Sequence, residues 1–107
     1  MRVIARRTLL QFVERHSRNR DYKALKSAVD AWFAEATKAQ WTGTADIKAR
    51  YATASIVSAE RIVFNIKGND YRLVVSVDFE KSIIWIKWIG THREYDRIDV
   101  KEIEHNG

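Results

Sequence analysis

The chain has 107 residues, a formal net charge of +5, no cysteine and no proline. This length suits a single domain spanning residues 1–107, and the lack of cysteine excludes disulfides and thiolate-zinc sites. No apolar stretch approaches the roughly 20 residues that a membrane helix needs. Arg6, Arg7, Glu14 and Arg15 also interrupt the first apolar positions, so we expect no signal peptide. We therefore expect a cytoplasmic protein with no membrane contact and with an anionic partner, most commonly nucleic acid.

The positive charge is concentrated in the first half of the chain. Residues 1–50 hold 11 of the 19 Lys and Arg residues but only 5 of the 14 Asp and Glu residues. Two interpretations stay open, because basic side chains can solvate a helix surface or form a patch that contacts phosphates. The arginines concerned are Arg2, Arg6, Arg7, Arg15, Arg18 and Arg20.

Helices are expected before strands in the chain. After a short possible strand at residues 2–4, apolar residues recur at helical spacing over residues 8–16 and again over residues 21–38. A shorter helix could follow over residues 44–51, whereas residues 53–58 indicate irregular or weakly extended chain. The two longer helices each present one apolar stripe, as helices that cover a sheet do.

From residue 61 onward the apolar period changes to two, which is typical of strands. We expect strands over residues 61–67, 70–79 and 82–89, joined by two-residue loops at Gly68-Asn69 and Glu80-Lys81. Three strands joined in this way form an antiparallel meander. Together with the helices, it predicts an α+β fold.

The loop positions fix the register, and with it the face on which each side chain lies. The expected pairs on the apolar face are Ile66 with Tyr71, Phe64 with Leu73, Ile62 with Val75, Val77 with Ile84, Val75 with Ile86, and Leu73 with Trp88. On the opposite face, the expected pairs are Asn65 with Arg72, Val74 with Lys87, and Ser76 with Trp85. The apolar face must lie under the helices, so the polar face is left for solvent or a ligand.

A short helical turn is expected directly after the third strand. Thr91 followed by Glu94 is a capping-box pattern, and His92 and Tyr95 then share one face of the turn, with Asp96 beside them. In the expected register Ile89 lies opposite Arg72. The turn should therefore leave the sheet next to Arg72.

Such a group meets the needs of RNA cleavage without a metal. The 2′-hydroxyl must lose a proton, the phosphorane charge must be matched, and the leaving 5′-oxygen must gain a proton. Arg72 suits bidentate phosphate contact, Lys87 adds a point charge, and His92 is the most credible proton carrier. Tyr95 could donate a proton or stack on a base. The competing interpretation is a solvated sheet surface with a structural histidine.

A metal site is not expected from this sequence. His16, His92 and His105 are widely separated, and there is no cysteine to complete a zinc site of ordinary spacing. The sequence also lacks a glycine-rich phosphate loop and a nucleophile elbow. We therefore expect neither a metal nor another cofactor.

Two segments resemble the core of HigB-type toxins of the RelE superfamily. They are RIVFNIKGNDYRLVV, residues 61–75, and GTHREYD, residues 90–96. The resemblance implies a RelE-like fold, with two N-terminal helices packed on one face of a twisted, mainly antiparallel sheet. It also implies a metal-independent endoribonuclease that cleaves translated messenger RNA on the ribosome. A HigA-like helix-turn-helix antitoxin would neutralise the toxin, which would be a monomer held in a hetero-oligomer with that antitoxin.

The resemblance also implies roles for individual residues. Arg72 would contact the phosphate and its transition state, with Lys67 and Lys87 as supporting cations. His92 and Tyr95 would transfer protons, in an order that the sequence leaves open, and Asp96 would orient His92 or a neighbouring arginine. The further RNA-binding candidates are Lys67, Asn65, Trp85 and Arg93. Asn65, like Asn69, could instead shape the hairpin.

Two alternatives to the ribonuclease remain. The first is a small, basic, non-catalytic domain that binds RNA or an antitoxin through the same face. The second is a DNA-binding accessory domain, which the absence of a recognition-helix pattern disfavours. The discriminating feature is the group of Arg72, His92 and Tyr95, because binding alone needs no proton carrier.

Overall fold

The computed structural model describes residues 1–101 and 103, which form five strands and four helices. In chain order these are β1 (Arg2–Ile4), α1 (Arg6–Arg15), α2 (Tyr22–Lys38), α3 (Thr44–Arg50), β2 (Ser55–Ile56), β3 (Arg61–Ile66), β4 (Tyr71–Asp78), β5 (Ile83–Thr91) and α4 (His92–Tyr95). The α+β class is thereby confirmed. Within the described residues, no helix has the length and apolar character needed to cross a membrane.

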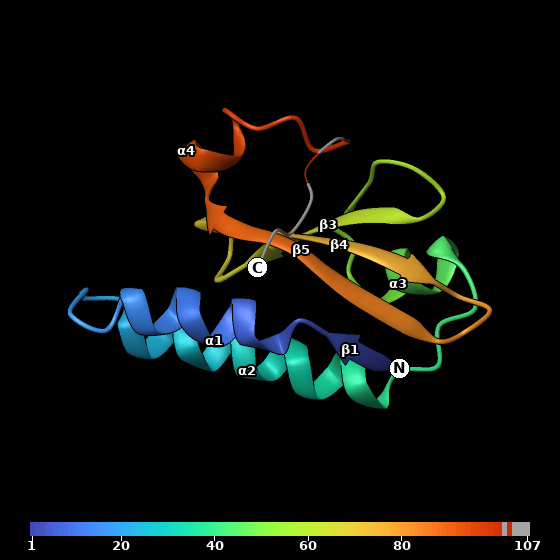
Figure 1. Ribbon diagram of the computed structural model, residues 1–107, viewed down its shortest axis with the longest axis horizontal. Helices are drawn as coiled ribbons and strands as arrows, with labels where there is room; N and C mark the ends of the chain where they lie inside the picture. The colour runs from blue at the N-terminus through green and yellow to red at the C-terminus, as the bar shows by residue number, and fades with distance from the viewer. Residues whose placement is uncertain (102, 104–107) are drawn as a thin grey trace.

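The strands form one mixed sheet in the order β1-β5-β4-β3-β2. The β3, β4 and β5 strands make the expected antiparallel meander, and β2 adds an antiparallel edge. The N-terminal strand β1 pairs in parallel with β5, so the two ends of the fold meet along one edge. Figure 1 shows α1 and α2 side by side along one side of this sheet and α4 on the other.

Apolar residues of the helices and of the sheet form one core. The rings of Trp32 on α2 and Phe64 on β3 are 5.4 Å apart, and those of Phe12 on α1 and Tyr71 on β4 are 5.8 Å apart. Leu73 and Ile89 belong to the same buried cluster. We call this surface of the sheet the core face. The opposite surface, the outer face, carries Asn65, Arg72, Val74, Ser76, Trp85 and Trp88.

The register of the first hairpin is confirmed, since Ile66 pairs with Tyr71 and Phe64 with Leu73. The conformation of its turn differs from a two-residue loop, because the positive φ values fall on Lys67 (54°) and Gly68 (64°). Glycine, which adopts positive φ without strain, occupies the second of these two positions, Gly68. Lysine at the other is an uncommon choice for left-handed backbone.

The register of the second hairpin is right near its turn and wrong beyond it. Val77 pairs with Ile84 and Val75 with Ile86, as expected, but a β-bulge between Val74 and Val75 shifts the remaining pairs by one residue. Leu73 therefore lies opposite Ile89 and not opposite Trp88, and Arg72 lies opposite Gly90 and not opposite Ile89. Val74 pairs with Trp88, which leaves Lys87 as the extra residue of the bulge.

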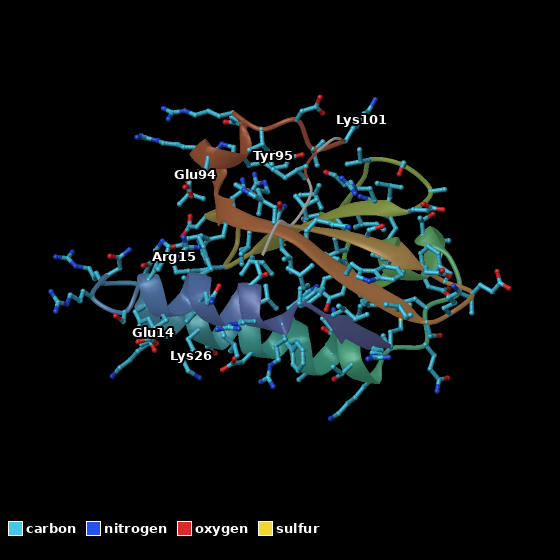
Figure 2. The ribbon with its side chains drawn as sticks, viewed as in Figure 1. Glu14, Arg15, Lys26, Glu94, Tyr95 and Lys101 are labelled. Carbon is cyan, nitrogen blue, oxygen red and sulfur yellow. The ribbon has the colours of Figure 1, made fainter. Side chains whose placement is uncertain are left out.

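The end of the described chain lies against the outer face. Nη1 of Arg61 donates to the carbonyl oxygens of Val100 (3.2 Å), Lys101 (3.2 Å) and Ile103 (2.8 Å). Figure 2 shows Tyr95 and Lys101 on the side of the sheet away from Glu14 and Arg15 of α1. Val74, on the outer face, has no exposed surface, so the centre of this face is covered.

Candidate active site

Arg72 lies at one end of the outer face, opposite Gly90. Its Nη1 donates to the carbonyl oxygens of Asn69, at 2.9 Å, and Tyr71, at 3.3 Å. Its Nη2 lies 3.1 Å from Nδ1 of His92. These contacts hold the guanidinium where the turn between β3 and β4 meets α4.

His92 is held by the capping box that the sequence predicts. The backbone N–H of Glu94 donates to Oγ1 of Thr91 at 3.1 Å, and the N–H of Thr91 donates to the Glu94 carboxylate at 2.8 Å. The N–H of His92 donates to the carbonyl of Asp70 at 3.0 Å. The first residue of α4 is therefore fixed both by its own cap and by the β3–β4 turn.

The contact between Arg72 and His92 defines the form of the imidazole. A guanidinium only donates hydrogen bonds, so this contact requires the neutral imidazole with Nδ1 as the acceptor, the tautomer that carries its proton on Nε2. Nε2 lies 3.7 Å from Oδ2 of Asp96. The imidazole thus has a lone pair directed at Arg72 and an N–H on the side of Asp96. Both His92 and Asp96 are exposed, with 53% and 61% of their side-chain surface accessible.

An aromatic pair lies beside this group. The rings of Trp88 and Tyr95 are 6.3 Å apart and tilted by 49°. Both side chains are partly exposed. Tyr95 was predicted from the sequence, but Trp88 was predicted to face the core. It reaches the outer face only because of the bulge at Lys87.

Lys67 is already matched by two carboxylates. Its Nζ lies 2.7 Å from Oδ2 of Asp70 and 3.8 Å from Oδ2 of Asp21. The hydrogen bond to Asp70 is the main reason why the pKa of Lys67 is raised above its usual value. Lys67 therefore remains cationic, but its charge is balanced within the protein.

The other predicted RNA contacts occupy different places. Asn65 donates from Nδ2 to the carbonyl of Thr53 at 3.4 Å, a contact that braces β3 against the preceding segment. Lys87 is the partly buried extra residue of the bulge, and Arg93 is exposed on α4. Only Arg93 among these three is adjacent in sequence to the pair of Arg72 and His92.

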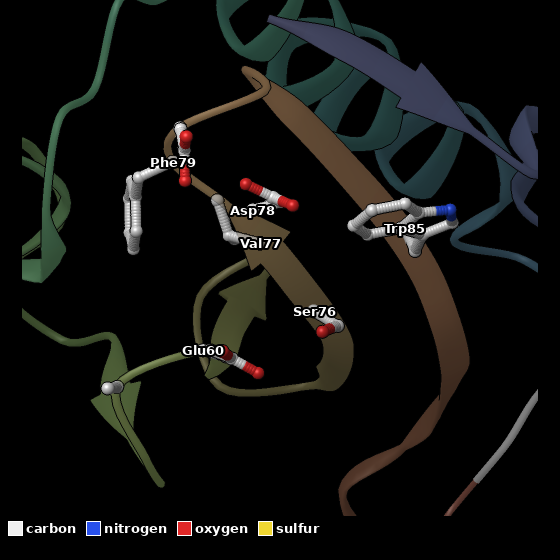
Figure 3. A pocket seen from close by; sticks show the side chains of 8 residues that line it. Glu60, Ser76, Val77, Asp78, Phe79 and Trp85 are labelled. Carbon is white, nitrogen blue, oxygen red and sulfur yellow. The ribbon is translucent and has the colours of Figure 1, made fainter.

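Trp85 lies at the other end of the outer face, in an acidic cavity of about 440 Å³. Figure 3 shows its ring across from Ser76 and Asp78, with Glu60 also lining the cavity from the segment just before β3. Ser76, the partner of Trp85, is four residues from Arg72, or about 13 Å along a strand. Trp85 is thus separate from the arginine and histidine, and its carboxylate neighbours disfavour a phosphate.

A partly buried hydrogen bond that the sequence analysis missed supports the candidate site. The hydroxyl of Tyr71 donates to Oδ2 of Asp21 at 2.6 Å. Burial, followed by this hydrogen bond, raises the pKa of Tyr71 to about 12. The residue before Arg72 is therefore tied to the turn between α1 and α2. The alternating pattern identified Tyr71 as a core residue but could not identify a partner 50 positions away.

Among the described residues, His16, the histidine outside the site, is not part of a metal centre. Nδ1 of His16 lies 2.8 Å from the carbonyl oxygen of Phe12, one helical turn earlier, and His105 lies outside the described residues. Among the residues that the structure describes, no three His, Asp, Glu or Cys side chains are grouped as ligands for a metal ion.

The structure thus defines a small α+β protein with an arginine and a histidine in contact at one exposed end of the outer face. Residues 25–98 match the HigB_toxin family, the RelE-like toxic component of a toxin-antitoxin system. This match covers more than half of the chain, so the protein belongs to that family, as its two sequence motifs indicated. Membership makes it the toxin component of a toxin-antitoxin system, with an antitoxin as its partner. No curated protein matches the chain.

Proposed function

We propose that the protein is a ribosome-dependent, metal-independent endoribonuclease that cleaves translated messenger RNA and so inhibits translation. The contact between Arg72 and His92 carries the proposal, because it joins a phosphate-binding group to a proton acceptor on an exposed surface. Family membership supports a toxic activity of this general kind. The proposal takes the fold as RelE-like, with α1 and α2 covering the core face.

The state of His92 suggests how the first step would proceed. Without RNA, the Nδ1 lone pair accepts a hydrogen bond from Arg72. A phosphate is a better partner for the guanidinium than a neutral imidazole, so a bound phosphate would draw Arg72 away from His92. The freed Nδ1 would then accept the proton of the 2′-hydroxyl. Asp96, on the Nε2 side, would stabilise the imidazolium that forms.

The bond changes follow from this attack. The 2′-oxygen forms a bond to phosphorus and the bond from phosphorus to the 5′-oxygen breaks, giving a 2′,3′-cyclic phosphate and a 5′-hydroxyl. Arg72 would balance the charge that develops on the non-bridging oxygens. Lys87 would add charge from the neighbouring strand. Tyr95 is the candidate donor of a proton to the leaving 5′-oxygen.

Other surfaces would hold the ribosome and the antitoxin. Arg6 and Arg7, like Arg15 and Arg18, have exposed side chains on α1 and the turn that follows it. A folded ribosomal RNA presents closely spaced phosphates that such side chains bind in a salt-dependent manner. We expect a HigA-like helix-turn-helix antitoxin to hold the monomeric toxin in a hetero-oligomer. Lys67, Asn65 and Arg93 remain proposed RNA contacts. Trp85 remains one only for a base, because the carboxylates that line its cavity disfavour a phosphate.

Mapping of messenger RNA 5′ ends after brief induction tests the proposal. Wild type should create new ends within translated frames, and Arg72→Ala and His92→Ala should abolish them while remaining folded. Lys81→Ala, in the β4–β5 turn, removes one exposed cation far from Arg72 and is the matched control. A folded wild-type protein that binds ribosomes and creates no new ends would favour the non-catalytic binding domain.

A further inference from the structure

We propose that Trp88 is a stacking platform for a base of the messenger RNA strand, next to the phosphate that Arg72 binds. This inference rests on the proposed function, since it names how the same site would hold its substrate. Four observations support it. They are the bulge at Lys87, the absence of a side chain at Gly90, the position of Tyr95, and the pairing of Gly90 with Arg72.

The bulge is what brings Trp88 to the outer face. Trp85 pairs with Ser76 on the outer face and Ile86 with Val75 on the core face. Simple alternation would then return Trp88 to the core face. The extra residue, Lys87, shifts the alternation, so Trp88 pairs with Val74 and lies on the same face as Arg72. Bulges often redirect a side chain next to an active site.

The indole of Trp88 occupies space that is free because residue 90 is a glycine. A Cβ at Gly90 would lie 2.4 Å from Cη2 and 2.5 Å from Cζ2 of Trp88, so the six-membered ring covers the glycine backbone. Gly90 does not have a positive φ, so its backbone conformation does not require a glycine. Glycine at this position instead leaves room for the Trp88 ring.

The position of the ring suits a base beside the phosphate. Gly90 is the direct cross-strand partner of Arg72, and such partners have Cα atoms about 5 Å apart. The indole over Gly90 is therefore next to the residue that would hold the phosphate. The Tyr95 ring lies beside the indole, with 6.3 Å between the ring centroids. A base and its own phosphate could then contact Trp88 and Arg72 together.

The chemistry favours a base over other ligands. Trp88 and Tyr95 are both partly exposed, and every nucleobase offers a flat face to an aromatic ring. Arg72, the cross-strand partner of Gly90, suits a phosphate, and His92, in contact with Arg72, suits a ribose hydroxyl. The Glu94 carboxylate, 3.1 Å from a Cβ placed at Gly90, is occupied by the N–H of Thr91. An amphipathic site of this kind matches a nucleotide. The acidic cavity around Trp85, in contrast, would repel the RNA backbone.

The ring has a second effect that an experiment must separate from stacking. Trp88 is the cross-strand neighbour of Val74, which is fully buried on the outer face, so its removal could also loosen the sheet. The Trp88→Leu variant would keep apolar cover over Val74 but would have no π face. The Trp88→Phe variant would keep both the apolar cover and an aromatic face. Comparing these two variants isolates the aromatic contribution.

The test uses purified ribosomes programmed with synthetic messenger RNA and measures kcat and KM for cleavage. The substrates are the normal strand and strands in which one nucleotide near the cut lacks its base. We expect Trp88→Leu to lower kcat/KM by roughly 5- to 150-fold, the range for loss of one base–aromatic stack, and Trp88→Phe to restore much of it. On the strand that lacks the stacked base, wild type and Trp88→Leu should cleave alike.

Gly90→Ala provides an independent variant, because it displaces the ring without changing it. Gly90→Ala should reduce cleavage in the wild-type background and have little further effect in the Trp88→Leu background. Equal kcat/KM for folded Trp88→Leu and wild type would overturn the inference. So would a Trp88→Leu defect that is the same on every base-deleted strand as on the normal strand. If wild type cleaves nothing on ribosomes, the proposed function fails first and the inference fails with it.

Discussion

The hydroxyl of Tyr71 donates a hydrogen bond of 2.6 Å to Oδ2 of Asp21, joining the first residue of β4 to the turn between α1 and α2. The next residue is Arg72, whose guanidinium also donates to the Tyr71 carbonyl at 3.3 Å. The candidate active site is thus attached to the helices through the residue that precedes its arginine. Changes at this partly buried hydrogen bond should therefore affect both folding stability and the site.

We expect Tyr71→Phe to lower the free energy of unfolding by about 1 kcal/mol, because a partly buried hydrogen bond is lost while the ring stays packed. Urea denaturation followed by circular dichroism measures the change. Tyr22→Phe, at the start of α2, is a matched control, because it removes a hydroxyl from a partly exposed tyrosine. An unchanged midpoint for Tyr71→Phe would show that the hydrogen bond to Asp21 contributes nothing to stability.

Tyr71 also predicts how stability depends on alkaline pH. The pKa of Tyr71 is raised to about 12 in the folded protein, whereas the pKa of a tyrosine in an unfolded chain is about 10. Between these values the unfolded chain binds fewer protons than the folded one, so stability falls as pH rises. Below the unfolded pKa this contribution is complete. Burial, followed by the Glu35 carboxylate, raises the pKa of Tyr51 as well, which adds a loss of the same sign.

The measurement is a series of urea midpoints between about pH 9 and about pH 12, for wild type and Tyr71→Phe. Wild type should lose stability steadily over this range, and the variant should lose less because one of its two shifted tyrosines is gone. Parallel curves for the two proteins would contradict the assignment of the effect to Tyr71.

The capping box of α4 allows the position of His92 to be disturbed without changing any charge in the site. Thr91→Ala removes the hydroxyl that accepts from the N–H of Glu94, which should cost about 1 kcal/mol of stability. Cleavage should fall as well, because His92 begins the helical turn that this cap fixes. Thr91→Ser keeps the hydroxyl and should retain both properties. Thermal melts and single-turnover cleavage give the two readouts, and full activity in a destabilised Thr91→Ala protein would argue against a positioning role.

Patterns that are local in sequence were enough to predict much of this structure. The period-two segments identified β3, β4 and β5, and loop positions alone gave the pairs Ile66 with Tyr71 and Val77 with Ile84. The capping box was also predictable, because Thr91 and Glu94 are three residues apart. Each of these features depends on neighbours within one hairpin or one helical turn.

Features that depend on the whole sheet were not predictable. A bulge needs only one extra residue, and nothing in the sequence around Lys87 separates it from regular alternation of apolar and polar positions. That single residue moved Trp88 from the core face to the outer face. The partner of Tyr71 was equally hidden, since Asp21 lies on another element 50 positions away. The edge strand β2, with two residues, is too short to give a period.

Replacing Arg72 by lysine tests whether the site needs a guanidinium or only a positive charge. Lysine keeps the charge, but its ammonium cannot reproduce the fork that spans the Asn69 carbonyl and Nδ1 of His92. Because this fork is the group proposed to grip the phosphate, Arg72→Lys should lower kcat by about 10²-fold or more, with little change in stability. Single-turnover cleavage on programmed ribosomes, with ribosome binding measured alongside, gives the result. Near-wild-type cleavage by Arg72→Lys would show that Arg72 acts only as a point charge, and the proposed release of His92 by a phosphate-bound guanidinium would then be wrong.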